Sequence, residues 1–412
     1  MLRALVVDLP RDPLAIARRL AGRPGLSLLL DDAGGTSYVA VEPDETSREL
    51  DPEPERPLAP GPNDLFRAPR WIGMIPYEAR RELERRDVRT DPRLAPQLTT
   101  PLWQRYAAVV EVGREVRVIG EDAGRVAALA RSLSRAAPPC EGSVVSLTHA
   151  EPDRVHAERV RAALEHIAKG DVYVINIARK FSFRVTGGAL PLLERLRLRA
   201  RSRYSAALDW QELRVACASP ELLLRSGPSG RIETSPIKGT RPRGLDAESD
   251  RRLASELERD PKEGAELAMV IDVERNDLGR VARAGSVRLL GSPEVVTLPS
   301  VHHRVASVVG ELRSGVSRAE LLRAVVPSGS VTGAPKVRAM ELVREIEADR
   351  RGLYTGGIGL VRHDGSLELA MAIRLLGVVG DEGEYFAGGG IVADSDPRRE
   401  TEETRWKARS VL

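Results

Sequence analysis

The chain has 412 residues, 42% of them hydrophobic, which is enough for a sizeable core in two or three domains or in one large unit. The formal net charge is only +3, and acidic and basic residues are interspersed along the chain. This argues against nucleic acid as a partner, because a surface that binds nucleic acid needs a stripe of basic residues. Two distant cysteines exclude a disulfide framework, and no apolar run could cross a membrane, so we expect a cytoplasmic protein without a membrane partner.

The first 145 residues predict short strands separated by long loops. Apolar or alternating runs predict strands at 4–9, 26–30, 38–41 and 109–119, and another apolar segment lies at 71–77. Segments 43–70 and 82–100 are charged and rich in proline, which predicts surface loops. Residues 122–136 have the pattern of a helix, and a linker ends near Ser146.

Helices and strands are easier to distinguish after this linker. Thr148 or Asp153 can cap a helix that ends at Gly170. The arginine-rich run 195–203 is typical of a solvated helix face. Strands are predicted at 172–183, 206–208, 213–218, 222–225, 231–234, 354–361, 367–376 and 385–386.

The loop predicted at 236–244 holds Lys238 between an apolar residue and a flexible one. Prolines near both ends stiffen the backbone, and Gly239 permits close approach to a ligand. A lysine that loses solvation there can act as a nucleophile, and Arg241 and Arg243 could hold a carboxylate. The alternative is an ordinary basic loop, because short motifs often match by chance.

Two predicted helices carry paired carboxylates in their first turns. Glu263 and Glu266 lie near the start of one helix, and Glu400 and Glu403 near the start of the last, where Lys407 follows one turn later. At this spacing both carboxylates of a pair lie on one face. If the pairs faced each other they would repel unless a cation held them, and Mg²⁺ suits oxygen ligands. The alternative is a solvated acidic face beside a positive helix N-terminus.

Two glycine-rich segments complete the candidate features. Residues 328–336 predict a turn into a helix at 337–346, whose first backbone amides suit an anion. Residues 387–391 lie between a strand and the final helix. These two turns leave open a non-catalytic phosphate- or nucleotide-binding protein.

Over residues 148–412 the chain resembles the chorismate-utilising enzymes, the superfamily of anthranilate synthase component I and aminodeoxychorismate synthase component I. The resemblance rests on SPELLLR, ETSPIKGTRPRG, KEGAELAMVIDVERNDLGRV, VHHRVASVVGELR, PSGSVTGAPKVRAMEL, RGLYTGGIG, AIRLL and AGGGIVADSDPRRETEETRWKA, in the order of the family. It implies an α+β fold, a large two-sheet sandwich of mostly antiparallel strands with outer helices. We expect an N-terminal anthranilate synthase component I-like region at 1–145 and a chorismate-binding catalytic region at 146–412, packed into one globular unit.

Lys238 decides which branch of the superfamily the chain resembles. Anthranilate synthases carry alanine at this position, whereas aminodeoxychorismate synthases carry PIKGT, as here. The resemblance implies that Lys238 attacks C2 of chorismate and expels the C4 hydroxyl, and that ammonia then expels the lysine to give 4-amino-4-deoxychorismate for 4-aminobenzoate and folate synthesis. Anthranilate synthase component I is the alternative, and the phosphate- or nucleotide-binding protein is a remote one.

The resemblance also implies roles for individual residues. Glu221 would be the acid that protonates the leaving hydroxyl, and His303 would lie near that hydroxyl, although His302 beside it leaves the choice open. Glu266 and Glu403 would bind Mg²⁺, with Glu263 and Glu400 holding its waters. The expected substrate-binding residues are Thr240, Ser330, Tyr354, Arg374, Gly388, Gly390 and Lys407.

One position departs from the family pattern. Val174 stands where the family often has glutamine, and where relatives that add water to chorismate have a basic lysine. Isochorismate and salicylate synthesis are therefore disfavoured. Neither Cys140 nor Cys217 lies in a glycine-flanked nucleophile turn, so the resemblance implies a glutamine amidotransferase on a separate chain, with free ammonia as the fallback substrate.

Overall fold

The computed structural model describes residues 2–54, 61, 63–79, 93, 97–138, 142–200, 202–298, 301–409 and 411. Most of the loop predicted at 82–100, and Cys140 in the predicted linker, lie outside these residues. Among the described residues, no helix combines the length and the apolar character needed to cross a membrane.

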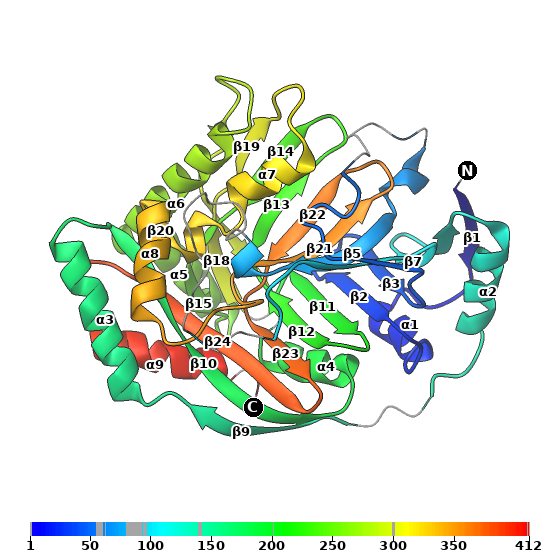
Figure 1. The fold of residues 1–412 in the computed structure, drawn as a ribbon, viewed down its shortest axis with the longest axis horizontal. Helices are drawn as coiled ribbons and strands as arrows, with labels where there is room; N and C mark the ends of the chain where they lie inside the picture. The colour runs from blue at the N-terminus through cyan, green and yellow to red at the C-terminus, as the bar shows by residue number, and fades with distance from the viewer. Residues whose placement is uncertain are drawn as a thin grey trace.

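The larger sheet has twelve strands and includes pieces from both ends of the chain (Figure 1). Its order is β1 (Arg3–Val7), β8 (Val116–Gly120), β7 (Ala108–Val112), β3 (Ser37–Ala40), β2 (Leu26–Asp31), β11 (Tyr204–Asp209), β12 (Arg214–Ser219), β23 (Leu375–Val379), β24 (Glu382–Ile391), β10 (Val174–Thr186) and β20 (Gly333–Ala334), with β9 (Val144–Ala150) also paired to β10. The N-terminal strand β2 pairs antiparallel with β11, with Leu28 opposite Ala207.

A second sheet of nine strands faces the first. Its order is β16 (Arg288–Leu289), β19 (Val308–Glu311), β14 (Arg231–Ser235), β13 (Leu222–Ser226), β22 (Leu367–Met371), β21 (Gly357–Arg362), β5 (Pro69–Ile75), β6 (Leu102–Arg105) and β4 (Glu45–Ser47). Buried side chains of both sheets form one apolar cluster, in which Ile72 and Ile358 of the second sheet join Ala206 and Val215 of the first. A third sheet contains β15 (Ile237–Pro242), β18 (Val301–Val305) and β17 (Glu294–Thr297).

Helices cover the outer faces of this sandwich. They are α1 (Pro13–Arg19), α2 (Ala123–Leu133), α3 (Asp153–Ala168), α4 (Ala189–Arg199), α5 (Ala247–Arg259), α6 (Pro261–Gly279), α7 (Arg318–Val325), α8 (Lys336–Ile346) and α9 (Pro397–Ala408), with the short 3₁₀ turns η1 (Asp64–Arg67) and η3 (Gly329–Val331). In Figure 1, α3, α8 and α9 lie at the left beside β10 and β24. The predicted α+β sandwich of antiparallel strands with outer helices is confirmed.

Several predicted elements were wrong in detail. The single strand expected at 109–119 is the hairpin of β7 and β8, because Gly113 and its neighbours turn the chain. The segment 367–376 is divided between the two sheets, since Arg374 has a positive φ of 50° between β22 and β23. The predicted loop around Lys238 is strand β15, and the glycines at 388–390 belong to β24.

Helix boundaries and caps also differ from expectation. Thr148 lies in β9, and α3 begins after Pro152 without a side-chain cap. Helices α1, α4 and α7 were missed or recognised only in part, although Ser317 and Glu320 form a reciprocal capping box at the start of α7.

Candidate active site

A cavity of about 490 Å³ lies where β15, β24, α6, α9 and η3 meet. All the site residues implied by the resemblance line it, although they come from widely separated segments. They are Glu221, Lys238, Thr240, Glu263, Glu266, His303, Ser330, Tyr354, Arg374, Gly388, Gly390, Glu400, Glu403 and Lys407. The tertiary structure therefore brings together every residue of the set that the resemblance implied.

Lys238 enters this cavity from β15, opposite β24. A Cβ atom placed on Gly390 would lie 3.5 Å from Lys238 Nζ, so the absence of a side chain on Gly390 leaves room beside the amine. Within the described part of the chain, Lys238 makes no hydrogen bond or ion pair. Gly239 follows at a φ of 85°, and a Cβ there would come within 2.6 Å of Leu257. Glycine at this position thus permits the backbone turn that presents the lysine.

Glu221 is a buried acid on the wall of the cavity, between β12 and β13. Ser330 Oγ donates a hydrogen bond of 2.7 Å to Glu221 Oε1. Burial raises the pKa of Glu221 to about 7, against the hydrogen bond from Ser330 and the charge of Lys238, which lower it. A carboxyl group with this pKa can hold a proton at neutral pH and release it to a leaving group.

His303 and His302 point to opposite sides of β18, as neighbouring strand residues do. His303 Nδ1 lies 2.9 Å from Thr240 Oγ1, while its buried Nε2 has no hydrogen-bond partner among the described residues. Burial, with a smaller contribution from Arg374, lowers the pKa of His303 to about 4, so the ring is neutral. His302 instead contacts Asp250 and Thr297, away from the cavity.

The two acidic pairs lie on the same cavity, as predicted. Asp260 caps α6 ahead of Glu263 and Glu266, and Asp396 caps α9 ahead of Glu400 and Glu403. Burial raises the pKa of Glu266, and the neighbouring carboxylates of Glu263 and Glu403 raise it further. Burial raises the pKa of Glu400 as well, with a contribution from Glu403.

The protein's own groups contact each of these four carboxylates. Lys407 lies 2.6 Å from Glu403, Lys262 lies 3.9 Å from Glu266, Arg241 lies 3.4 Å from Glu263, and Ser395 donates a 2.8 Å hydrogen bond to Glu400. In these positions no group of three or more metal-binding side chains is close enough to hold an ion, as far as the described residues show. The oxygen-only donors suit Mg²⁺, but a bound ion would have to displace Lys262 and Lys407 from the carboxylates.

Tyr354 and Arg374 form another wall of the cavity. The ring of Tyr354 stacks on Phe386 at a centroid distance of 5.6 Å. Arg374 donates a 3.0 Å hydrogen bond to Ser202, and burial lowers its pKa. Lys407 donates to the carbonyl of Gly388 at 2.7 Å, which joins α9 to β24. A guanidinium and an ammonium on one small cavity give it groups that can bind an anion.

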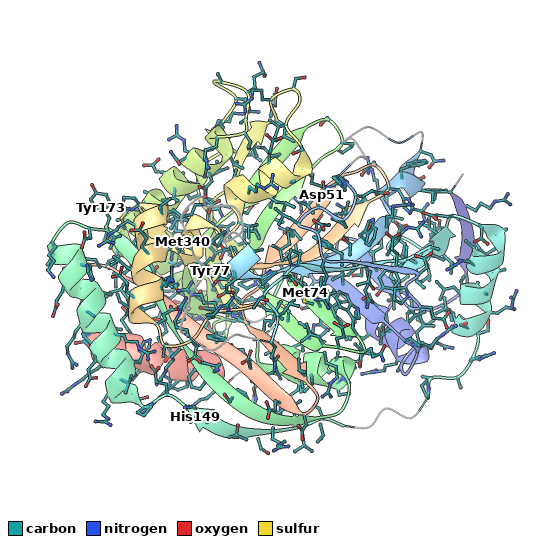
Figure 2. The ribbon with its side chains drawn as sticks, in the orientation of Figure 1. Asp51, Met74, Tyr77, His149, Tyr173 and Met340 are labelled. Carbon is teal, nitrogen blue, oxygen red and sulfur yellow. The ribbon has the colours of Figure 1, made fainter. Side chains whose placement is uncertain are left out.

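A buried ion pair behind this wall was not predicted. Arg351 and Glu347 are 2.6 Å apart with side chains only 1% and 3% exposed. Arg351 also donates to the carbonyls of Val331 and Asn176 and lies over the ring of Tyr354. The same guanidinium lies 4.9 Å from the ring centroid of Tyr77, which Figure 2 places near the centre of the molecule. RGLYTGGIG contains the arginine, and Glu347 lies four residues before it, but neither residue type showed from sequence that the pair is buried.

The two arginines predicted to hold a carboxylate serve the fold instead. Arg241 and Arg243 pair with Asp260 and Asp250, and neither arginine lines the cavity. Lys336, at the start of α8, is buried against Asp277 at 2.6 Å and does not line the cavity either. The sequence of a short basic segment does not show which carboxylate each of its arginine or lysine side chains will contact.

The fold and this cavity together define an enzyme-like site for a small acidic molecule, with a lysine, a buried acid and four carboxylates. The chorismate binding enzyme family matches residues 36–412, and the chain belongs to this family. The specific reaction is not resolved by this membership, because relatives with different names share the family.

Known relatives include proteins of both branches. The chain is 44% identical over 254 residues to anthranilate synthase component 1 of Aquifex aeolicus, covering 61% of this chain and about half (51%) of that protein. It is 35% identical over 344 residues to aminodeoxychorismate synthase component 1 of Klebsiella aerogenes, covering 83% and 76%. The structure is similar to anthranilate synthase component I from Streptococcus pneumoniae, with a TM-score of 0.74, 26% identity and coverage of 100% and 92%.

Proposed function

We propose that this chain converts chorismate and ammonia to 4-amino-4-deoxychorismate through a covalent intermediate on Lys238. The placement of Lys238 carries the proposal: its amine enters the cavity beside Gly390 and makes no ion pair within the described residues. An amine that attacks carbon must be neutral and approachable. A lysine held in a salt bridge would not be approachable.

The first step forms a bond between Lys238 Nζ and C2 of chorismate while the bond from C4 to its hydroxyl oxygen breaks. Glu221 supplies the proton with which that hydroxyl leaves as water, since its raised pKa keeps it protonated near neutral pH. The neutral Nε2 of His303 is available to hydrogen-bond the departing group. Ammonia then forms the bond to C4 as the bond from C2 to Lys238 breaks.

Arg374, Tyr354 and Lys407 would hold the substrate carboxylates by charge and hydrogen bonding, with Ser330, Thr240 and the backbone near Gly388 and Gly390 completing the cavity. Mg²⁺ would be bound by Glu266 and Glu403, with Glu263 and Glu400 reaching it through water. When bound, the ion neutralises a carboxylate of the substrate.

The source of ammonia is a glutamine amidotransferase on a separate chain, or free ammonia in its absence. The product would supply 4-aminobenzoate and folate synthesis. Val174, at the start of β10, lies beside the Gly390 position with Cγ2 3.6 Å from the Cβ site. An aliphatic group there cannot act as a base, which disfavours the addition of water.

Anthranilate synthesis is the second candidate, favoured by the 44% identity to the Aquifex aeolicus relative. In that case Lys238 would not be a nucleophile, and the products would be anthranilate and pyruvate. This reaction needs no covalent bond to the protein.

A product assay separates the two candidates. Purified chain is incubated with chorismate, Mg²⁺ and ammonium, and products are identified by mass spectrometry, with NMR locating the amine on the ring. We expect aminodeoxychorismate from the wild type and its loss in Lys238→Ala. Lys262→Ala removes another lysine of the same cavity and should retain the product at reduced rate. Anthranilate from the wild type, or unchanged product from Lys238→Ala, would refute the proposal.

A further inference from the structure

A line of four polar side chains runs from the cavity into the interior. Ser330 Oγ contacts Glu221 Oε1 at 2.7 Å, Ser328 Oγ lies 3.0 Å from Ser330 Oγ, and Ser328 Oγ also contacts Glu274 Oε1. All four side chains are buried, and Glu274 and Ser328 do not line the cavity. Glu274, on α6, is therefore joined to the proposed acid without touching the substrate space.

The protons available to this line can be counted. Three contacts join the four side chains, and each hydrogen bond needs one proton. The two hydroxyls supply only two protons, because each serine donates once. The backbone N–H of Ser330 donates to Ser328 Oγ and thus fills an acceptor site without supplying a proton to the three contacts. The third proton must come from a carboxyl group, so Glu221 and Glu274 cannot both be ionised while the line is complete.

The surroundings of Glu274 favour such sharing. Its Oε2 is buried and has no hydrogen-bond partner within the described ranges, which is costly for an ionised carboxylate. The hydrogen bond from Ser328 and the charge of Lys336 favour ionisation of Glu274, with smaller contributions from the Thr234 hydroxyl and the Ser330 backbone N–H, but the Lys336 amine already contacts Asp277. The charge of Lys238 likewise favours ionisation of Glu221. Burial is the largest influence on both acids and raises both pKa values.

We propose that Glu221 and Glu274 share one carboxyl proton through the hydroxyls of Ser328 and Ser330, so that Glu274 is a positioning residue for the acid of this site. When the proton is at Glu221, each hydroxyl donates toward Glu274; when it is at Glu274, both hydroxyls donate toward Glu221. Moving between the two states transfers one proton along three hydrogen bonds and leaves the total number of protons unchanged. The catalytic part of this inference rests on the role proposed for Glu221.

Glu274→Gln tests the shared proton. In the wild type, removing the proton that Glu221 and Glu274 share creates a second buried negative charge and breaks one hydrogen bond, and both effects oppose its loss. In the variant the amide can donate to Ser328 and carries no charge, so Glu221 should lose its proton more easily. We expect the alkaline limb of the pH–rate profile to move down by about one pH unit, as a like charge in the interior would cause. The assay follows chorismate loss, so it remains valid whichever product is formed.

A second readout needs no substrate. Infrared titration of the full chain detects the C=O band of protonated Glu221, assigned by its absence in Glu221→Gln, and this band should titrate about one pH unit lower in Glu274→Gln. A failure of the proposed reaction would change the product but leave this titration intact.

Variants of Ser328 decide the matter if Glu274→Gln does not fold. Ser328→Ala removes the connection, lets Ser330 donate permanently to Glu221 and should lower both midpoints, whereas Ser328→Thr keeps a hydroxyl and should restore them. Asp272→Asn removes an exposed carboxylate from the same helix and should leave both midpoints unchanged. Midpoints in Glu274→Gln or Ser328→Ala equal to those of the wild type would overturn the proposal.

Discussion

Breaking the buried pair of Arg351 and Glu347 should destabilise the whole chain and not only its active site. Arg351→Met leaves the Glu347 carboxylate buried with the backbone N–H of Ala178 as its remaining donor among the described residues. An uncompensated buried charge of this kind costs about 3–5 kcal/mol, far more than an average substitution. For a chain of this length, that corresponds to a fall in Tm of roughly 3–6 °C, from the usual unfolding entropy per residue.

The assay is thermal and urea unfolding of Arg351→Met, of Glu347→Leu and of the double variant. The double variant removes both charges, so we expect it to be more stable than the sum of the single losses predicts. Arg252 and Glu256 have the same i, i+4 spacing, but their side chains are 70% and 54% exposed; Glu256→Gln should therefore change stability by less than about 1 kcal/mol. Strictly additive losses for Arg351 and Glu347 would refute the reasoning, because they would show that the two charges do not depend on each other.

Three further predictions follow from the cavity. Chorismate turnover should fall as the pH rises through about 7, because Glu221 with a pKa of about 7 then loses the proton it donates; a flat profile across this range would exclude Glu221 as the acid. Gly390→Val should abolish turnover but leave Tm nearly unchanged, because the added side chain would face Lys238 Nζ in the cavity. Gly388→Val should lower Tm, because a Cβ there meets the carbonyl oxygen of Ile177 at 2.6 Å. Equal losses of Tm in the two variants would contradict this difference. The free energy of unfolding should decrease as the pH falls from about 6.5 to about 4, because the histidine binds a proton in the unfolded state but stays neutral in the folded state, where the pKa of His303 is lowered to about 4. His303→Gln should remove up to about 3 kcal/mol of this pH dependence, measured by urea titration at each pH. An unchanged dependence would show that His303 is solvated.

The spacing of the paired carboxylates was accessible from local sequence, whereas the other site residues followed from the resemblance of the motifs to a known family. Glu263 and Glu266 share a helix face whatever the fold, and Asp260 marks the start of that helix. The motif around Lys238 likewise identifies a residue of the cavity, although its secondary structure was predicted wrongly. Its glycines and prolines predict a loop, yet it pairs with β18 as a strand.

The partners of charged side chains were not accessible, because only the folded structure decides which of several carboxylates, near or far along the chain, each charge contacts. Arg241 meets Asp260 instead of a ligand, and Lys262 and Lys407 contact Glu266 and Glu403, two of the four carboxylates predicted to surround a metal. The choice between His302 and His303 also needed the structure, since the two are neighbours in sequence but only His303 faces the cavity.

By itself the sequence determined many of the helices and strands, the paired carboxylates and the glycine-rich turns, because periodicity and motif spacing are local properties; the class of fold and the full set of site residues followed from the resemblance of its motifs to a family. Tertiary structure decided which strands pair, where the chain passes from one sheet to the other at Arg374, and how Glu274 reaches Glu221. These features depend on contacts between residues tens or hundreds of positions apart. Their free energy comes from burial and from hydrogen bonds that exist only once the two sheets have closed over the core.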